Sequence, residues 1–312
     1  MKKFVVTPGI KYYYFAEISD KNIYVVEEPF VSENNRIKAN FMRIAKKIGM
    51  KRFYTLFLQE WKYKLLECDS CIIFDQAYSE ALAFAIRKFN PRIRINLYIW
   101  NVSKNNQDLF KRIASQKGGL KIWSFDKLDC KKFGFEFSPM VYNFNGMESI
   151  CNSGGMLNYD VVFVGYLKQR GALISEIYRL LQGMDMRTYF YVVKSESIPS
   201  NLSEKLPYEL HDSYLPYEEY RNILMKSRVV LDVTEPGQVG LTIRALETIR
   251  YKRKIITNNA DIKNYDFYNE NNIFVFGVDD LETLPNFIKS SYIDIAPSVL
   301  EKYNFSDWVK KF

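Results

Sequence analysis

Short runs of apolar residues recur along the chain, and most are followed by a stretch with helical spacing. Runs with few polar residues are typical of strands buried on both faces of a parallel sheet, whereas apolar positions every three or four residues predict amphipathic helices. This alternation predicts an α/β fold with helices on both faces of each sheet. The predicted strands are 4–6, 23–26, 70–74, 94–100, 120–125, 159–164, 187–193, 228–231, 254–257 and 272–276. The predicted helices are 40–49, 79–89, 106–114, 172–181, 217–227, 241–249, 281–290 and 297–312.

A segment without periodicity, 143–158, divides the pattern into two halves. It contains Gly146, Gly154 and Gly155, and it reads as a linker. We therefore expect a first Rossmann-like domain at 1–150 and a second at 156–296, with 297–312 as a C-terminal helix that packs back on the first domain. Two such domains face each other across a cleft, and ligands bind at the carboxyl ends of their strands.

The composition restricts the classes of protein and site. Of the 312 residues, 47% are hydrophobic, enough for a sizeable core. No apolar run is long enough to span a membrane, and the N-terminus lacks the pattern of a signal peptide, so we expect a cytoplasmic protein. His211 is the only histidine, so a His-based triad or multi-His metal centre lacks its residues. Cys68 and Cys71 have no second pair, and we expect them, with Cys130 and Cys151, to be buried or incidental thiols.

The charge is uneven. Residues 1–155 hold 25 Lys and Arg and 15 Asp and Glu, a net charge of +10, whereas 156–312 hold 19 and 21, a net charge of −2. A basic half favours an anionic partner: a membrane surface, a phosphorylated acceptor or nucleic acid. Because its basic residues form no nucleic-acid-binding motif, nucleic acid is not expected. An ordinary solvated surface would give the same counts.

The stretch from Asp232 to Glu247 carries the most chemical information. It reads as a strand end, a glycine-rich turn and a helix, and such a turn lets the backbone approach a phosphate closely. Gly240, Arg244 and Glu247 share one helix face, so a cation for a phosphate and a carboxylate for a ribose would lie together. Alternatively, the glycines only shape the turn, and Arg244 pairs with Glu247.

A second turn, 165–171, follows the first strand of the second half. Lys168 and Arg170 lie there between Gly165 and Gly171. Cations flanked by glycines at a strand-to-helix turn suit a diphosphate, although a surface loop carries ordinary basic residues too.

These two turns, with the strand "KRKIITNN" that follows them, resemble the second domain of GT-B glycosyltransferases of bacterial lipopolysaccharide and capsular polysaccharide clusters. The resemblance covers most of residues 156–280 and extends only weakly into the first half. It implies GT-B architecture, with an acceptor-binding first domain and a second domain that binds a nucleoside diphosphate sugar.

The resemblance also implies roles for residues. Glu247 suits the ribose, and Tyr217 lies where the fold holds the base. Glu235 lies twelve residues before Glu247, beyond the family's usual spacing, so Gln238 and Thr242 are further candidates for the sugar contact. The implied sugar-donor site comprises Gly165, Lys168, Arg170, Tyr217, Glu235, Gly237, Gln238, Gly240, Leu241, Thr242, Arg244 and Glu247.

The reaction implied is transfer of a hexosyl or deoxyhexosyl group to a hydroxyl of a lipid-linked or oligosaccharide acceptor. Cations and helix N-termini neutralise the diphosphate in this family, so neither a metal nor another cofactor is expected. In an inverting enzyme a first-domain carboxylate deprotonates the acceptor, and Asp75, then Glu17, are the candidates. Asp75 could instead cap a turn. The basic half suggests peripheral association with the inner face of the cytoplasmic membrane.

Two alternatives remain open. A two-domain nucleotide-sugar epimerase of similar fold would be expected to bring further acidic residues and histidines to the site. A non-catalytic two-domain binding protein would be expected to carry a signal peptide. Nucleotide binding separates these classes from one another most simply.

Overall fold

A computed structural model of the chain describes residues 2–6, 20–26, 30, 40–41, 44, 50, 53, 56, 58–102, 107–115, 119–144, 156–195 and 206–312. The chain divides into two compact units: Met1–Pro139 with Asn304–Phe312, and Met140–Tyr303. Glu17, Cys151, most of the predicted helix 40–49 and the centre of the predicted linker lie outside the described residues.

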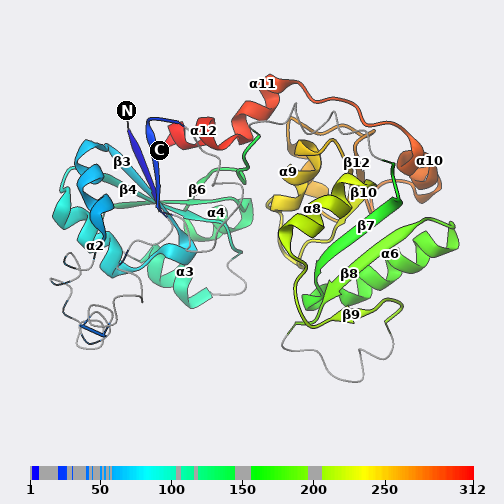
Figure 1. The fold of residues 1–312 in the computed structure, drawn as a ribbon, viewed down its shortest axis with the longest axis horizontal. Coiled ribbons are helices and arrows are strands. Elements are labelled where there is room, and N and C mark those ends of the chain that lie inside the picture. The colour runs from blue at the N-terminus through cyan, green and yellow to red at the C-terminus, as the bar shows by residue number, and fades with distance from the viewer. Residues whose placement is uncertain are drawn as a thin grey trace. The chain divides into compact units, whose positions relative to one another are not determined.

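The first unit is a six-stranded parallel sheet in the order β2-β1-β3-β4-β5-β6 (Figure 1). Its strands are β1 (Lys3–Val6), β2 (Ile23–Val26), β3 (Ser70–Phe74), β4 (Arg94–Ile99), β5 (Leu120–Ser124) and β6 (Glu136–Phe137). Its helices are the 3-10 helices η2 (Glu60–Glu67), η3 (Asp75–Ala77) and η9 (Val309–Lys311), and the α-helices α2 (Glu80–Phe89), α3 (Gln107–Ala114), α4 (Lys127–Phe133) and α12 (Phe305–Trp308).

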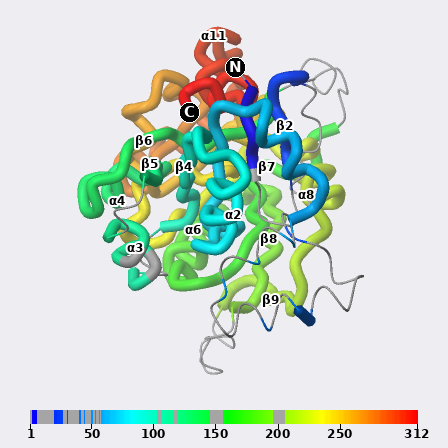
Figure 2. The backbone as a smooth tube through the Cα atoms, turned by 90° about the vertical axis from the view of Figure 1, so that its left-hand side faces the viewer, coloured from blue at the N-terminus to red at the C-terminus, as the bar shows by residue number. Residues whose placement is uncertain are grey.

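Helix α2 shows how the apolar pattern builds this unit. The Ser79 side chain caps the helix by accepting a hydrogen bond from Leu82 N at 3.1 Å. Leu82 and Ile86 recur at helical spacing and pack in one core with Ile73 of β3. Figure 2 shows α2 in front of the strands that it covers.

The last residues of the chain complete the core of the first unit. Trp308 is fully buried, and its ring centroid lies 4.7 Å from that of Tyr98 in β4. Phe312 packs against Trp123 of β5 with 4.8 Å between centroids, and Lys3 Nζ donates to the Phe312 carbonyl at 2.5 Å. The two labelled chain ends accordingly lie side by side in Figure 1.

The second unit is also a six-stranded parallel sheet, in the order β12-β11-β10-β7-β8-β9. The prediction of two α/β domains with parallel sheets is therefore confirmed. The strands are β7 (Tyr159–Tyr166), β8 (Thr188–Val193), β9 (Leu210–His211), β10 (Ser227–Asp232), β11 (Lys254–Thr257) and β12 (Ile273–Val275). The helices are η5 (Lys168–Arg170), α6 (Gly171–Gly183), α8 (Tyr217–Met225), α9 (Ile243–Arg250), η6 (Ala260–Asn264), η7 (Leu281–Thr283), α10 (Leu284–Lys289), α11 (Pro297–Leu300) and η8 (Glu301–Tyr303).

Three expectations about elements were wrong. The stretch 165–171 is not one loop, because Gly165 pairs with Val192 of β8 and Gly171 begins α6. The helix expected at 241–249 begins at Ile243, because the side chain of Thr242 caps it. The tail 297–312 is four short helices, and the first unit begins again at Asn304.

Candidate functional site

The end of β10 and the start of α9 are joined through the side chain of Asp232. This carboxylate is 2% exposed. It accepts a hydrogen bond from the Thr242 hydroxyl at 2.7 Å and lies 3.4 Å from Nη1 of Arg244. Thr242 Oγ1 in turn accepts from Ala245 N at 3.3 Å, so the carboxylate fixes the first turn of the helix. Asp232 was not among the predicted site residues. Its position at the end of a buried strand is the signal that could have identified it.

Arg244 is held on several sides. Its Nη2 donates to the carbonyl of Val164 at the end of β7, and its guanidinium lies 5.7 Å from the ring centroid of Phe163. Among the described residues, no acceptor faces its buried Nε–H. Burial disfavours the charge, but Tyr220 and Asp232 beside it help to raise the pKa of Arg244 above its ordinary value. The side chain is therefore a charged group with an unused hydrogen-bond donor.

A second arginine lies beside the first. Arg170 donates to the carbonyl of Tyr166 at 2.8 and 3.2 Å and to the carbonyl of Val233. Burial, with the neighbouring charge of Arg244, lowers the pKa of Arg170 to about 10. Two guanidiniums this close repel each other, and an anion bound between them would relieve the repulsion.

Gly165 makes this pairing of arginines sterically possible. A Cβ at this position would lie 3.3 Å from Nη2 of Arg244 and 3.5 Å from Nη2 of Arg170. Both guanidiniums thus lie against the backbone at the carboxyl end of β7. Parallel α/β sheets bind ligands at this end of their strands.

Lys168 adds a third cation to the same turn. Its φ is +44°, an uncommon value for a residue with a side chain, and its ammonium group pairs with the carboxylate of Glu235. The predicted residues Lys168, Arg170, Glu235 and Arg244 are therefore brought together. Their role in binding an anion stays a prediction.

The loop between β10 and α9 is shaped by its own hydrogen bonds. Thr234 N donates to Asn258 Oδ1 at 2.7 Å, and Asn259 Nδ2 donates to the Val239 carbonyl at 3.1 Å. Gln238 Nε2 donates to the Gly240 carbonyl at 3.2 Å. Gly237 has a φ of +85°, which favours glycine, and Leu241 is buried. The structure places these predicted residues in one loop beside the arginines.

Glu247 lies deeper than a ribose contact on the surface would. Its side chain is buried, burial raises its pKa, and its Oε2 accepts from the hydroxyl of Tyr220 at 2.9 Å. The hydroxyl of Tyr217 lies 3.0 Å from that of Tyr142. The carboxylate that pairs with Arg244 is that of Asp232. The alternative in which Arg244 simply pairs with Glu247 is therefore not the arrangement found. Sequence reasoning missed Tyr220 and Tyr142, which nothing in the sequence connects to Glu247.

Asp75 lies in the first unit, directly after β3, where it begins η3. Its carboxylate accepts from Asn101 Nδ2 at 2.9 Å and from Gln76 N at 2.9 Å. Burial outweighs these hydrogen bonds and raises its pKa to about 6. The residue thus closes a turn and is also suited to exchange a proton near neutral pH. The second candidate base, Glu17, lies outside the described residues.

The described cysteines, Cys68, Cys71 and Cys130, are free thiols. Cys68 and Cys71 are buried and unbonded to each other, and burial raises the pKa of Cys68 to about 11. Within the described ranges, no group of three or more His, Cys, Asp or Glu side chains is placed to hold a metal ion. No described helix is long and apolar enough to cross a membrane.

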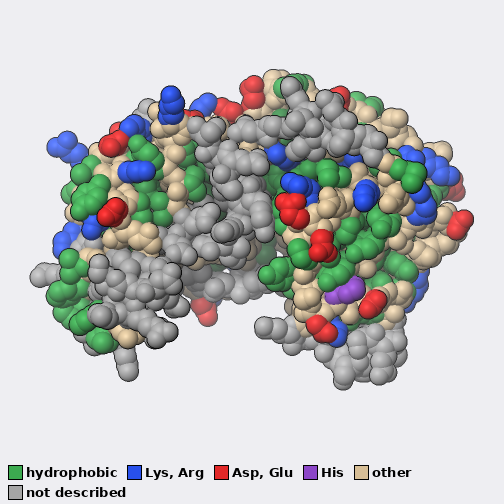
Figure 3. Space-filling model, viewed as in Figure 1, with side chains coloured by type: hydrophobic (Ala, Val, Ile, Leu, Met, Phe, Trp, Pro, Cys, Tyr) green, Lys and Arg blue, Asp and Glu red, His purple; other side chains and the backbone are tan. Residues whose placement is uncertain are grey.

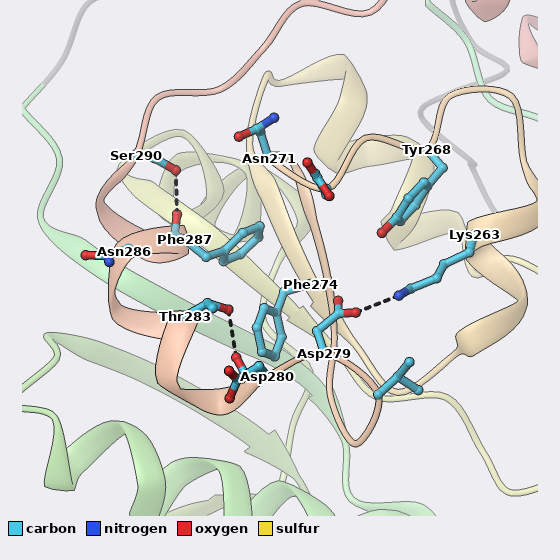
Figure 4. A pocket seen from close by; sticks show the side chains of 12 residues that line it. Lys263, Tyr268, Asn271, Phe274, Asp279, Asp280, Thr283, Asn286, Phe287 and Ser290 are labelled. Atoms are coloured by element: carbon cyan, nitrogen blue, oxygen red, sulfur yellow. Dashed lines mark hydrogen bonds and ion pairs between the residues drawn. The ribbon is translucent and has the colours of Figure 1, made fainter.

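A separate pocket of about 630 Å³ in the second unit lies beside β12 and α10 (Figure 4). Lys263 and Asp279, which line it, pair with each other at 2.6 Å, and Thr283 donates to the Asp280 carbonyl at 2.7 Å. None of the predicted sugar-donor residues lines this pocket. The arginine cluster is therefore a different site.

Comparisons with known proteins concern the fold. No protein-family model and no curated protein matches the chain. A solved UDP-forming α,α-trehalose-phosphate synthase from Burkholderia xenovorans matches with a TM-score of 0.52 at 11% identity, over 100% of this chain and 98% of that one. The chain therefore has the fold of that synthase, two Rossmann-like domains of the GT-B class.

Two larger solved structures match less well. TarM matches with a TM-score of 0.45 at 12% identity, over 80% of this chain and 53% of that one. The Gap123 glycosylation-associated protein complex of Streptococcus agalactiae matches with a TM-score of 0.38 at 10% identity, over 80% and 51%. The chain spans about half the length of these two proteins.

Proposed function

We propose that the protein is a glycosyltransferase that moves a sugar from a nucleoside diphosphate sugar to a hydroxyl of a saccharide acceptor. The observation that carries the proposal is the pair of guanidiniums, Arg170 and Arg244, packed against Gly165 at the carboxyl end of β7. The matching fold of a solved synthase that forms UDP supports it. An epimerase would need the same contacts to hold its nucleotide sugar, and the fold match to the synthase is what favours transfer.

Each residue of the cluster takes a role in this proposal. Arg170 and Arg244 contact the diphosphate, and Lys168 exchanges its pairing with Glu235 for a phosphate oxygen. Their positive charges stabilise the negative charge that develops on the diphosphate as its bond to the sugar breaks. A metal ion is not required for this neutralisation.

The remaining roles follow the family resemblance. The resemblance assigns Glu247 to the ribose, although its buried carboxylate accepts a hydrogen bond from Tyr220, and it assigns Tyr217 to the base. Glu235, Gln238 or Thr242 binds the transferred hexosyl or deoxyhexosyl group. If the enzyme inverts, Asp75, or else Glu17, removes the proton from the acceptor hydroxyl, whose oxygen then attacks the anomeric carbon.

We place the reaction in the synthesis of a cell-surface polysaccharide, with a lipid-linked or oligosaccharide acceptor. The net charge of +10 in residues 1–155 suits a protein that associates with the anionic inner face of the cytoplasmic membrane. Lys and Arg side chains lie on the surface of the first unit on the face shown in Figure 3. Sedimentation with vesicles tests this part, and equal binding to neutral and anionic vesicles contradicts it.

A nucleotide panel tests the proposal as a whole. UDP, GDP, dTDP and CMP are each added to the protein, and its thermal unfolding is followed. We expect one nucleotide to raise the unfolding temperature, because a ligand that binds only the folded state stabilises it. If none raises it, the sugar-donor site does not exist as proposed.

A further inference from the structure

A pocket of about 500 Å³ in the first unit is rich in cations. Four positively charged side chains line it, from the end of α2, the starts of β4 and β5, and the C-terminal segment: Arg87, Arg94, Lys121 and Lys311. No acidic residue is among those that line it. Like charges gathered in a concave site raise the local potential and attract anions.

Two of these cations have no ion-pair partner in the part of the chain that the structure describes. Among the described residues, no carboxylate lies within ion-pair distance of Arg87 or Arg94, whereas Lys121 lies 3.7 Å from Glu136. The guanidinium of Arg87 lies over Gly119, where a Cβ would come within 3.1 Å of its Nη2. Both arginines are therefore free to form paired hydrogen bonds with a phosphate.

The floor of the pocket is rigid and polar. Asn96 is 4% exposed and links two neighbours: its Nδ2 donates to Ser70 Oγ at 2.9 Å, and its Oδ1 accepts from Trp123 Nε1 at 3.0 Å. Phe312 packs against the Trp123 ring, and Lys121 Nζ lies 4.3 Å from the ring centroid. These contacts fix the indole beside the cations of the pocket.

The pocket lies at the opposite end of the sheet from the candidate base. Arg94 begins β4 and pairs in register with Ser70, whereas Asp75 follows the end of β3. Asp75 lies five residues beyond Ser70 along the strand direction. At 3.3 Å per residue, this separates the level of Arg94 from that of Asp75 by about 16 Å. The pocket is therefore separate from the reaction proposed above and does not depend on it.

We propose that this pocket binds the phosphate group of a phosphate ester, with Arg87 and Arg94 on the phosphate and Trp123 against the group that carries it. Two sources share this chemistry: a soluble phosphorylated molecule and the phosphate of a lipid headgroup. In either case the pocket holds a ligand in the first unit away from Asp75.

The test uses the full chain and two probes, inorganic phosphate in calorimetry and vesicles of phosphatidylcholine with or without phosphatidylglycerol. The variant R87Q/R94Q removes the two arginines, and K64Q/K132Q removes two exposed charges of the same unit that do not line the pocket. We expect phosphate to bind saturably and R87Q/R94Q to weaken it at least about tenfold, with less than about a twofold effect of K64Q/K132Q. If R87Q/R94Q does not fold, the single variants R87Q and R94Q replace it.

The two probes separate the two sources. Phosphate binding that R87Q/R94Q weakens, without vesicle binding that depends on phosphatidylglycerol and the two arginines, points to a soluble ester; the two together point to a lipid headgroup. Absence of phosphate binding, with vesicle binding that depends on phosphatidylglycerol and on the two arginines, points to a lipid headgroup. The proposal is overturned if both double variants lose binding equally or if neither probe binds. It is also overturned if only Lys168→Ala, in the other unit, removes phosphate binding.

Discussion

The carboxylate of Asp232 lies 3.4 Å from Nη1 of Arg244; Asp232 is buried at the end of β10, and the Arg244 side chain is partly buried. This contact orients the guanidinium whose Nη2 reaches the carbonyl of Val164. Removing the carboxylate leaves a buried cation with fewer partners, which costs far more than the loss of an exposed pair.

Asp232→Asn is expected to lower the free energy of unfolding by about 3 kcal/mol, because Arg244 loses its buried counter-charge. The exposed pair Glu218–Arg221 gives the matched control. Glu218→Gln should cost less than about 0.5 kcal/mol. Urea unfolding of both variants measures the difference, and equal costs would show that Asp232 does not hold Arg244.

Gly165→Ala tests the close approach of the two arginines. A methyl group 3.3 Å from Nη2 of Arg244 displaces that guanidinium. We expect nucleotide affinity to fall about tenfold, while stability changes by about 1 kcal/mol. Gly183→Ala is the control, because a Cβ there meets nothing within 4 Å. Calorimetry that finds the same affinity in both variants contradicts the packing argument.

Asp75→Asn should stabilise the fold at pH 8. The pKa of Asp75 is about 6 in the folded chain and close to 3.9 in the unfolded chain, so the folded state binds more protons between these values. Stability therefore falls as pH rises from about 4 to about 6, and the neutral amide avoids this loss, gaining about 1–3 kcal/mol above pH 6. Unfolding at pH 4 and pH 8 measures the effect, and a variant that gains nothing at pH 8 relative to pH 4 contradicts it.

The same substitution should lower activity. If Asp75 is the base, kcat rises with pH through about 6, and Asp75→Asn lowers kcat by about 10²–10⁴-fold. Rates measured from pH 5 to pH 8 on a working sugar donor and acceptor provide the check. A variant with normal kcat and an unchanged pH profile would show that Asp75 is not the base and only stabilises the turn.

The sequence predicted the architecture because buried parallel strands are continuous apolar runs. The strand at 70–74 was found with its bounds, and Ser79 marked the start of α2. The short edge strands β6 and β9 were missed, because two residues carry no periodicity. The extension of β7 through Gly165 depends on pairing with Val192, which lies far along the chain and is invisible to a local pattern.

The candidate site was predicted in part. Lys168, Arg170 and Arg244 were selected by residue type and turn position, and the structure places Lys168 and Arg170 on the turn that faces Arg244. The partner of Arg244 was missed, because a pattern at i and i+3 pointed to Glu247, whereas the tertiary fold supplies Asp232. Long-range contacts of this kind are set by the sheet register and not by sequence spacing.

Calorimetry of the nucleotide that stabilises the protein best tests directly whether Arg244 holds a diphosphate. The nucleoside diphosphate is compared with its monophosphate in the wild type and in Arg244→Ala, with Arg221→Ala as a control at an exposed arginine. We expect the wild type to prefer the diphosphate by at least about tenfold, and Arg244→Ala, but not Arg221→Ala, to lose this preference. Equal affinity for the two nucleotides in the wild type, or an unchanged preference in Arg244→Ala, would contradict a diphosphate site at Arg244.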